Sequence, residues 1–580
     1  MTNNDPTIRI SNLSFTYPGA PRPSLNNISL EIERGDFLAV IGGNGCGKST
    51  FCKALNGLIP HFFSGEFDGS VELDGLDTLS HGVGELAKKI GYVYQDFENQ
   101  ILRPTVLDDA SFACLNYAMK DYLAQGREAL GQIGLADKEE DYVWQLSGGQ
   151  KHLLALAGAA ALKPDILVLD EPVAQLDPQH AFCIYDLLRE LNEKYGKTIL
   201  VIEHHTEFIA RYCKHVMLMR DGGMLWKLPV NEALNRVDEL LENDIHPPQI
   251  TLAAHRFIHT GAASADTQLP TTQEDGKAFF ESFTPTGYAV ARQKAAKPLA
   301  EAAIQFRDVC VKYRAVKGKD PVILEHFSLD VHRGEKIALI GCNGAGKTTI
   351  LKLMTGLLKP KGGVVAVCGA STSGRSPEDI SRDISLVYQN PEEMFIRDCI
   401  RDDIEYAMRV RGMKDYERRA QELMAMFNLQ GLAERDGRLL SGGQMRRASL
   451  AVGIALNPSI LLLDEPTANL DISTRKEIAK TLEALNDVVE TAIIATHDMQ
   501  LVAEWAERII VLYRGAIIAD GTREEVFGDS HAVELAGIRP PDIYLMGKAL
   551  QDGAQCFTVD EFVGYFKPAM EEEVAYVKAR

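Results

Sequence analysis

Two glycine-rich segments of the chain have the residue types and spacing needed to hold phosphate groups. Gly42–Ser49 reads GGNGCGKS, and Gly341–Thr348 reads GCNGAGKT. Glycine lets the backbone turn tightly and point its N–H groups at phosphate oxygens, and a following helix adds the positive end of its dipole. An apolar run precedes each segment, as this motif requires. The two copies predict two nucleoside triphosphate sites.

The lysine and hydroxyl side chains of these loops have predicted roles of their own. Lys48 and Lys347 would reach the β- and γ-phosphates, whereas Ser49 and Thr348 would ligate Mg²⁺. The predicted phosphate-loop residues are Gly42, Asn44, Gly45, Gly47, Lys48, Ser49 and Thr50 in the first copy and Gly341, Asn343, Gly344, Gly346, Lys347, Thr348 and Thr349 in the second.

An acidic pair follows an apolar run in each half of the chain. Ile166–Leu169 is followed by Asp170 and Glu171, and Ile460–Leu463 is followed by Asp464 and Glu465. Short continuous apolar runs are typical of strands buried on both faces of a parallel sheet, whose carboxyl ends meet ligands. We expect the aspartates to hold Mg²⁺ through water and the glutamates to polarise the attacking water.

The elements that must position these residues occur twice in the chain. The sequence LSGGQ appears at Leu146–Gln150 and again 294 residues later, and the IHPP beginning at Ile245 answers the IRPP beginning at Ile538. Strand-like runs alternate with predicted helices, which indicates an α/β fold. We divide the 580 residues into a first ATPase domain (1–235), a small C-terminal extension (236–280), a linker (281–302), a second ATPase domain (303–528) and a second extension (529–580).

The serine of each LSGGQ stands 23 residues before the aspartate of the acidic pair. With the phosphate loops, this spacing resembles that of tandem ABC ATPases over nearly the whole chain. The resemblance implies two P-loop NTPase domains, each with a RecA-like core, an antiparallel β subdomain and a helical subdomain that carries the signature. It also implies that the two domains close on two ATP molecules, so that Lys48 would share a site with Ser441, and Lys347 with Ser147.

The resemblance assigns the remaining site residues one by one. Its signature contacts to ATP would be Ser147, Gly149 and Gln150 in one half and Ser441, Gly443 and Gln444 in the other. Tyr17 and Tyr313 match the aromatic residue that stacks on adenine, and Gln95 and Gln389 match the glutamine that senses Mg²⁺ and water. His204 and His497 match the switch histidine at the γ-phosphate, and Asp177 and Asp471 match the aspartate that closes the following loop.

The two halves depart from each other at three places near these motifs. Leu153 answers Arg447, and Val173 answers Thr467. The switch region reads Glu-His-His from Glu203 in the first half and Thr-His-Asp from Thr496 in the second. Both halves keep the lysine, the acidic pair, the signature serine and the histidine. We therefore expect both sites to hydrolyse ATP, at different rates.

The segments after the two glutamines indicate which process the ATPase drives. Gln95 is followed by DFENQI and Gln389 by NPEEMF. These stretches resemble those of the ATPases of energy-coupling factor (ECF) transporters, in which a groove receives a coupling helix from the transmembrane T component. The resemblance implies a T component, a substrate-binding S component and import of a vitamin, a vitamin precursor or a transition-metal ion. The Pro-Pro segments resemble the C-terminal extension of the same ATPases.

Two other functions stay open. The chain resembles fused ATPases of sugar or peptide importers, although tandem sugar ATPases typically have one degenerate site. Translation-type ABC factors also carry two ABC units, but usually with a long charged linker. The 61 basic and 81 acidic residues give a net charge of −20, which argues against nucleic-acid binding through bulk electrostatics. With no apolar run of about 20 residues and no signal peptide, we expect a peripheral protein on the cytoplasmic face of the membrane, held there by its partners.

Overall fold

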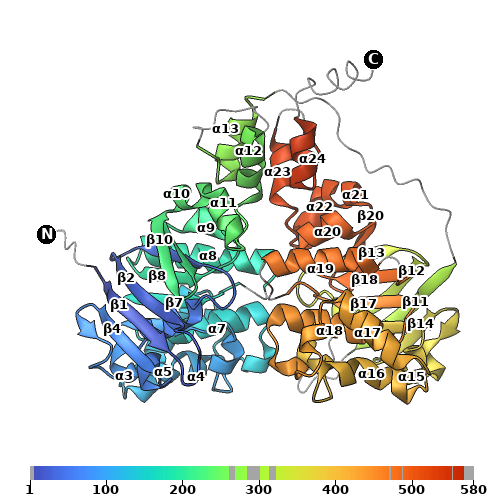
Figure 1. Ribbon diagram of the computed structural model, residues 1–580, viewed down its shortest axis with the longest axis horizontal. Coiled ribbons are helices and arrows are strands. Elements are labelled where there is room, and N and C mark those ends of the chain that lie inside the picture. The colour runs from blue at the N-terminus through green and yellow to red at the C-terminus, as the bar shows by residue number, and fades with distance from the viewer. Residues whose placement is uncertain are drawn as a thin grey trace. The chain divides into compact units, whose positions relative to one another are not determined.

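The computed structural model describes residues 6–173, 176–259, 268–283, 301–312, 322–468, 470, 472–485, 488–550 and 553–566. The chain divides into two compact units, coloured blue to green and yellow to red in Figure 1. Unit 1 comprises residues 1–286, 549–551 and 566–580, and unit 2 comprises residues 287–548 and 552–565. Most of the predicted linker, residues 284–300, lies outside the described residues. The domain boundaries given above stay predictions.

Unit 1 is built on two sheets. The first is antiparallel, in the order β2-β1-β4-β5, with β1 (Ile8–Thr16), β2 (Leu25–Ile32), β4 (Glu66–Leu73) and β5 (Leu76–Asp77). The second has the order β10-β9-β3-β8-β7-β6, with β3 (Phe37–Ile41), β6 (Ile90–Val93), β7 (Ile166–Asp170), β8 (Thr198–Ile202), β9 (His215–Arg220) and β10 (Gly223–Pro229). It is parallel apart from the β9–β10 pair.

The register of the second sheet brings the predicted site to one edge. Strand β8 lies between β3 and β7, and Asp170 at the end of β7 pairs with Ile202 at the end of β8. The phosphate loop leaves the end of β3 next to them. Because parallel strands end at the same edge, the loop, the acidic pair and the switch histidine come together there.

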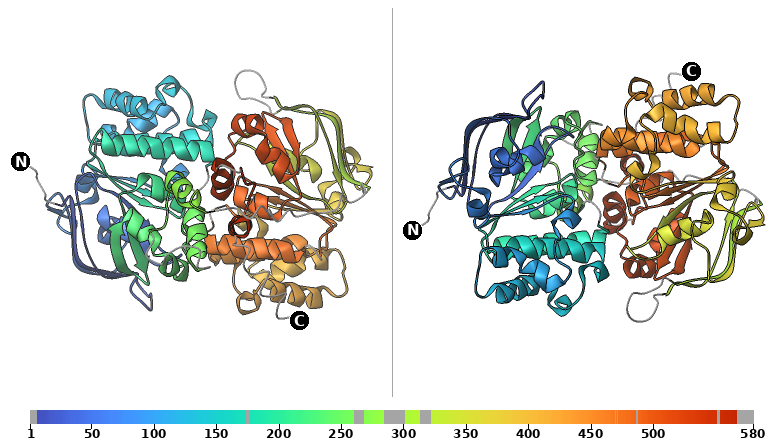
Figure 2. Two further views of the ribbon diagram at one scale, coloured as in Figure 1. Left: turned by 90° about the horizontal axis from the view of Figure 1, so that it is seen from above. Right: turned by 90° about the horizontal axis from the view of Figure 1, so that it is seen from below.

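Helices cover both faces of this sheet (Figures 1 and 2). They are α1 (Lys48–Leu55), α2 (Leu58–His61), α3 (Val83–Leu86), α4 (Val106–Ala110), α5 (Phe112–Asn116), α6 (Tyr122–Gln132), α7 (Gly148–Ala160), α8 (Pro178–Glu193), α9 (Thr206–Tyr212), α10 (Val230–Asn235), α11 (Val237–Glu242), α12 (Gln249–His259) and α13 (Gln273–Phe280). Three short 3₁₀ helices join them: η1 (Phe97–Gln100), η2 (Ala136–Lys138) and η3 (Val143–Gln145). Helices α4 to α7 pack on one another and form the helical part that carries the signature.

Unit 2 repeats the strand order of unit 1. Its antiparallel sheet, β12-β11-β14-β15, contains β11 (Ala302–Lys312), β12 (Val322–His332), β14 (Gly362–Val367) and β15 (Ala370–Ser371). Its larger sheet, β16-β17-β18-β13-β19-β20, contains β13 (Lys336–Ile340), β16 (Ile384–Val387), β17 (Ile460–Asp464), β18 (Thr491–Ala495), β19 (Arg508–Tyr513) and β20 (Ala516–Gly521).

The helices of unit 2 also follow those of unit 1. They are α14 (Lys347–Met354), α15 (Pro377–Ile380), α16 (Ile400–Val410), α17 (Tyr416–Met426), α18 (Gly442–Ile454), α19 (Ile472–Ala484), α20 (Met499–Trp505), α21 (Arg523–Gly528), α22 (Ser530–Leu535), α23 (Asp542–Ala549) and α24 (Val559–Tyr565). The 3₁₀ helices are η4 (Thr372–Gly374), η5 (Pro391–Met394), η6 (Gln430–Leu432) and η7 (Gly437–Leu439). Over the residues that the structure describes, no helix is both long enough and apolar enough to span a bilayer.

The core explains why the central strands are apolar without interruption. In β7, Leu167 and Leu169 belong to the cluster on one face of the sheet, and Ile166 and Val168 belong to the cluster on the other. Successive side chains of a strand point to opposite faces, so a strand covered on both sides needs apolar residues at every position. The predicted α/β fold is confirmed.

Candidate active sites

The phosphate loop of unit 1 is closed around the ammonium group of Lys48. This side chain is 7% exposed, and its Nζ donates to the carbonyl oxygens of Gly42 at 2.8 Å and Gly43 at 3.1 Å. Gly47 precedes α1 with φ of 105°, a left-handed conformation that side chains disfavour. The loop therefore brings a cation and the N-terminus of a helix to the edge of the sheet.

Unit 2 has the same arrangement around Lys347. Its Nζ donates to the carbonyl oxygens of Gly341 at 2.7 Å and Cys342 at 3.3 Å. Gly346 precedes α14 with φ of 107°. Both predicted loops thus adopt a conformation able to cradle phosphate.

Each phosphate loop touches the aspartate of the acidic pair through its hydroxyl residue. Ser49 hydrogen-bonds to Asp170 in unit 1, and Thr348 hydrogen-bonds to Asp464 in unit 2. Burial raises the pKa of both aspartates, and the charge of the adjacent glutamate raises it further. A cation bound nearby would lower the pKa of both aspartates. The oxygen donors of a hydroxyl and a carboxylate are the ligands that Mg²⁺ prefers, so these residues fit the ion.

The glutamates of the acidic pairs have a backbone conformation that few side chains adopt. Glu171 has φ of 51° and Glu465 has φ of 46°. Each is anchored to the next strand, because the N–H of Glu171 donates to Ile202 O at 3.1 Å and that of Glu465 to Ala495 O at 2.8 Å. Such a conformation costs about 1–3 kcal/mol and persists only where the surrounding structure fixes it. Its presence in both units marks the two glutamates as positioned groups.

In unit 1 the glutamate joins the predicted glutamine and histidine. Gln95 Nε2 donates to Glu171 Oε2 at 2.7 Å, and His204 Nε2 lies 3.1 Å from Glu171 Oε1. Burial opposes the charge of Glu171, but the hydrogen bond and charge of His204, with help from Lys48 and Gln95, lower its pKa overall. Glu171 is therefore a carboxylate at neutral pH, as a group that polarises water must be.

In unit 2 the histidine contact is present and the glutamine contact differs. His497 Nδ1 forms an ion pair with Glu465 Oε1 at 2.9 Å. Burial disfavours the charged forms of both groups, but their mutual attraction lowers the pKa of Glu465 and raises the pKa of His497. The side chain of Gln389 is exposed and, among the described residues, makes no hydrogen bond that matches that of Gln95.

The signature serines begin long helices. Ser147 precedes α7, its Oγ accepts from Gln150 N at 3.3 Å, and Gln150 Oε1 accepts from Ser147 N at 2.9 Å. Ser441 and Gln444 form the same capping box at the start of α18. Both serines are exposed, with Gly149 and Gly443 in the first turn of the helix behind them. Each signature thus presents the N-terminus of a 13-residue helix.

The remaining predicted residues are placed in part. The hydroxyl of Tyr17 lies 3.5 Å from Thr50 Oγ1, so this ring stands beside the phosphate-loop helix. Asp177 is buried and caps α8 by accepting from His180 N at 3.0 Å. Tyr313 and Asp471 lie outside the described residues.

Comparison with known proteins places these sites in a family. The family model described as ABC transporter matches residues 25–174 and 324–468. The chain belongs to the ABC transporter family. A Methanosarcina acetivorans protein named "Putative ABC transporter ATP-binding protein" is 31% identical over 93% of this chain and 89% of its own length. A relative of the same description from Caldanaerobacter subterraneus subsp. tengcongensis is 31% identical over 98% of this chain and 100% of its own. A solved structure of cbiO1 from Clostridium perfringens, titled as part of the ABC transporter complex cbiONQ, is 29% identical over 45% of this chain and 100% of its own, with a TM-score of 0.38.

The family match confirms several predictions. The chain is a tandem ABC transporter ATP-binding protein with one ABC domain in each unit. It is an ATPase, and its cofactors are ATP and Mg²⁺. ABC ATP-binding subunits work with transmembrane partners at the membrane. The ECF subfamily, the substrate and the roles of individual residues stay predictions.

Two residues near the glutamine loops of this ABC ATPase escaped the sequence analysis. Arg446, only 2% exposed, donates to the carbonyl oxygens of Tyr388 at 2.8 Å and Gln389 at 2.7 Å, so it fixes the backbone of the loop in unit 2. Its counterpart in unit 1 is His152, which is buried against the ring of Phe97. The available signal was a pair of adjacent arginines, Arg446 and Arg447, just before the apolar part of the helix, at positions answered by His152 and Leu153 in unit 1.

Proposed function

We propose that this chain is the ATP-hydrolysing subunit of an ECF-type importer of a vitamin, a vitamin precursor or a transition-metal ion. Its partners would be a transmembrane T component and a substrate-binding S component, which hold it on the cytoplasmic face of the membrane. The observation that carries the proposal is a rigid loop after each predicted glutamine, which presents an apolar side chain to solvent.

The two loops are locked by buried aspartates. Asp109 Oδ1 accepts from the N–H groups of Leu102 at 2.8 Å and Arg103 at 2.9 Å. Asp403 Oδ1 accepts from those of Ile396 and Arg397, both at 2.9 Å. The aspartates are 7% and 3% exposed, whereas Leu102 and Ile396 are 66% and 61% exposed. An apolar side chain held out on a fixed backbone at the same place in both units favours docking of an amphipathic helix.

Charge beside these loops favours a basic partner helix. Exposed acidic residues precede both apolar side chains, namely Asp96 and Glu98 in unit 1 and Glu392 and Glu393 in unit 2. Glu98 is paired with Lys151 at 2.7 Å, which leaves unit 2 with the more acidic surface. A partner helix with basic residues around an apolar stripe would complement both loops, and its basic residues would favour the loop of unit 2.

In the proposed mechanism, each unit contributes most of one ATP site. Lys48 and Lys347 bind the β- and γ-phosphates, and Tyr17 and Tyr313 stack on adenine. The Mg²⁺ ligands would be Ser49, Gln95 and Asp170 in unit 1 and Thr348, Gln389 and Asp464 in unit 2; the ion supplies positive charge to the phosphates.

The chain's own residues orient the water. Glu171 and Glu465, held as carboxylates in a left-handed backbone, align water for in-line attack, and His204 and His497 fix those carboxylates. The signatures at Ser147 and Ser441 would complete the γ-phosphate contacts of the opposite unit. Closure would then move helices docked at the Leu102 and Ile396 loops.

Purification with trapped ATP tests the proposal. The Glu171→Gln, Glu465→Gln double variant is isolated from native membranes in mild detergent with ATP, and co-purifying proteins are identified by mass spectrometry. We expect a polytopic membrane protein together with small hydrophobic binding subunits. Ribosomes without a membrane protein would overturn the proposal in favour of a translation factor. A permease pair without small hydrophobic subunits would overturn it in favour of another importer.

A matched pair of surface variants sharpens this experiment. Leu102→Ala combined with Ile396→Ala removes both proposed docking side chains, and Leu225→Ala combined with Leu357→Ala removes two leucines of comparable exposure elsewhere. We expect the first pair to lose the membrane partner and keep ATP binding, and the second pair to keep both. Equal recovery of the partner by the two pairs would contradict the docking assignment.

A further inference from the structure

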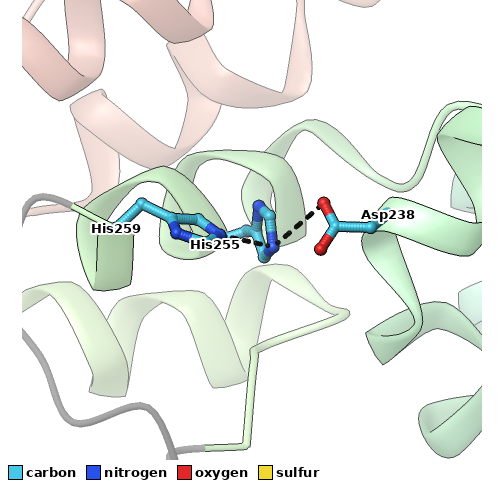
Figure 3. Close-up of side chains that lie close together, drawn as sticks. All are labelled: Asp238, His255 and His259. Carbon is cyan, nitrogen blue, oxygen red and sulfur yellow. Dashed lines mark hydrogen bonds and ion pairs between the residues drawn. The ribbon is translucent and has the colours of Figure 1, made fainter.

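Three possible metal ligands converge in the C-terminal part of unit 1. Asp238 lies in α11, and His255 and His259 lie in α12 (Figure 3). His255 Nε2 is 3.1 Å from His259 Nε2 and 3.6 Å from Asp238 Oδ1. All three ligand atoms lie within 4.8 Å of one another.

The two histidines lie on one face of helix α12. Residues four apart lie on the same face of a helix, so His255 and His259 are neighbours. The opposite face is anchored in the core by Ile250, Ala254 and Phe257, which are at most 2% exposed. The side chain of His255 is 18% exposed and that of Asp238 is 76% exposed. The buried face of α12 therefore holds the two histidines in place, and the cluster is open to water on the side of Asp238.

We propose that Asp238, His255 and His259 bind a divalent transition-metal ion, with Zn²⁺ as the reference ion. Zn–N bonds of about 2.0–2.1 Å in a tetrahedral site put neighbouring ligand atoms about 3.3–3.4 Å apart. The separations of 3.1 Å and 3.6 Å lie on either side of that value. Two imidazoles and one carboxylate suit Zn²⁺, Ni²⁺ or Co²⁺ better than Mg²⁺, and the open side leaves room for water as a fourth ligand.

The three side chains of the cluster come from two different helices, α11 and α12. The bound ion would join α11 to α12 and so stabilise this part of unit 1.

Among the described residues of unit 2, the positions that answer Asp238 and His255 do not repeat the cluster, and the position that answers His259 lies outside them. At the offset of 293 residues that relates the Pro-Pro segments, His531 answers Asp238, and Lys548 answers His255. Lys548 Nζ lies 3.4 Å from Ser530 Oγ, so this position carries a cation that would repel a metal ion. Unit 2 therefore supplies a matched control within the same chain.

Metal titration of the tag-free, full-length chain tests the proposal. The chelator-treated protein is titrated with Zn²⁺ by calorimetry in excess Mg²⁺, and Co²⁺ is added in parallel to follow the visible absorption of four-coordinate cobalt. We expect one high-affinity site per chain, and a higher melting temperature with Zn²⁺. His255→Ala and His259→Gln should each weaken binding by about 100-fold. Asp238→Asn, which changes an exposed side chain, should weaken binding with the fold intact.

The unit 2 variants His531→Ala and Lys548→Ala should bind Zn²⁺ like the parent. Zn²⁺ binding that survives both histidine substitutions in unit 1 would overturn the proposal, and so would binding only in the millimolar range. Circular dichroism of each variant separates lost ligands from lost folding. ATP hydrolysis with Mg²⁺ alone should be unchanged, because none of the three residues belongs to the proposed ATP sites.

Discussion

Each unit has a histidine–glutamate contact, made through Nε2 of His204 in unit 1 and Nδ1 of His497 in unit 2, and the supporting residues differ. In unit 1, Glu203 is 2% exposed and accepts from the N–H groups of His204 at 2.8 Å and His205 at 2.9 Å. The hydroxyl of Tyr185 also donates to Glu203, at 2.6 Å. Burial raises the pKa of Glu203 against these hydrogen bonds. A buried acid and a phenol thus fix the backbone after β8.

In unit 2 the backbone after β18 is held by smaller side chains. Thr496 stands in place of Glu203, and its hydroxyl accepts from Asp498 N at 3.0 Å. The Thr467 hydroxyl donates to Asp498 Oδ2 at 3.0 Å, linking the switch region to the segment after β17. Unit 1 has Val173 in place of Thr467, so it lacks this link. The switch segment is therefore tied to α8 in unit 1 and to the acidic-pair loop in unit 2.

The phosphate-loop lysines should show the largest effect on ATP hydrolysis and the least difference between units. Lys48→Ala and Lys347→Ala each remove a buried ammonium group. Because the proposed closure needs ATP in both sites, each should lower steady-state ATPase activity by about 100-fold, equivalent to about 2.7 kcal/mol. Equilibrium binding of a fluorescent ATP analogue should fall from two sites to one in each variant. Retention of two ATP sites by either variant would show that the lysine of that loop is not needed for ATP binding.

The residues that support the two glutamine loops, Arg446 and His152, should show the next largest difference between units, in the loss of stability on substitution. Arg446→Ala removes two hydrogen bonds from a buried cation to the loop of unit 2, and we expect a loss of stability of about 3 kcal/mol. His152→Ala removes a buried ring that touches Phe97, with an expected loss of about 2 kcal/mol. Calorimetric melting of both variants measures the difference. A larger loss for His152→Ala would contradict the assigned importance of the arginine.

Substitution of the residues that support the switch segments, Glu203 and Thr467, should have smaller effects on stability. Glu203→Gln keeps an acceptor for the backbone N–H groups and should be close to neutral, whereas Glu203→Ala leaves them unpaired and should cost about 1–3 kcal/mol. Thr467→Val in unit 2 imitates Val173 and should cost about 1 kcal/mol. Urea unfolding and ATPase rates measure both. Equal effects of Glu203→Gln and Glu203→Ala would show that the acceptor is unimportant.

The smallest expected effect is a pH dependence at His497 of unit 2. The folded-state pKa of His497 is raised above 6.5, so its stabilisation is complete below pH 6.5 and is lost as the pH rises through the folded pKa. The difference in melting temperature between the parent and His497→Asn should therefore shrink from pH 6 to pH 9, by about a few degrees. A constant difference over this range would contradict the ion pair with Glu465.

The parts of the fold that local chemistry dictates could be predicted from the sequence. Glycine spacing defines the loops around Lys48 and Lys347, and continuous apolar runs define strands buried on both faces. The meeting of Gln95, Glu171 and His204 also follows, because the carboxyl ends of parallel strands share an edge. These features depend on short segments whose geometry varies little.

Features that depend on neighbours distant in sequence could not be predicted. The left-handed backbone of Glu171 depends on its bond to the adjacent strand, and the role of Arg446 depends on carbonyl groups of another loop. The spacing of His255 and His259 was visible, but their approach to Asp238 is set by how α12 packs against α11. Such contacts arise from packing that no single segment encodes.

We infer that both units carry a working ATP site, each held by different supporting residues. The steady-state ATPase rates of Glu171→Gln and Glu465→Gln, measured separately with equal ATP binding verified, test this claim. We expect each substitution to lower the rate strongly and the two residual rates to differ. An unchanged rate in either variant would contradict the claim, because that site would then not hydrolyse ATP.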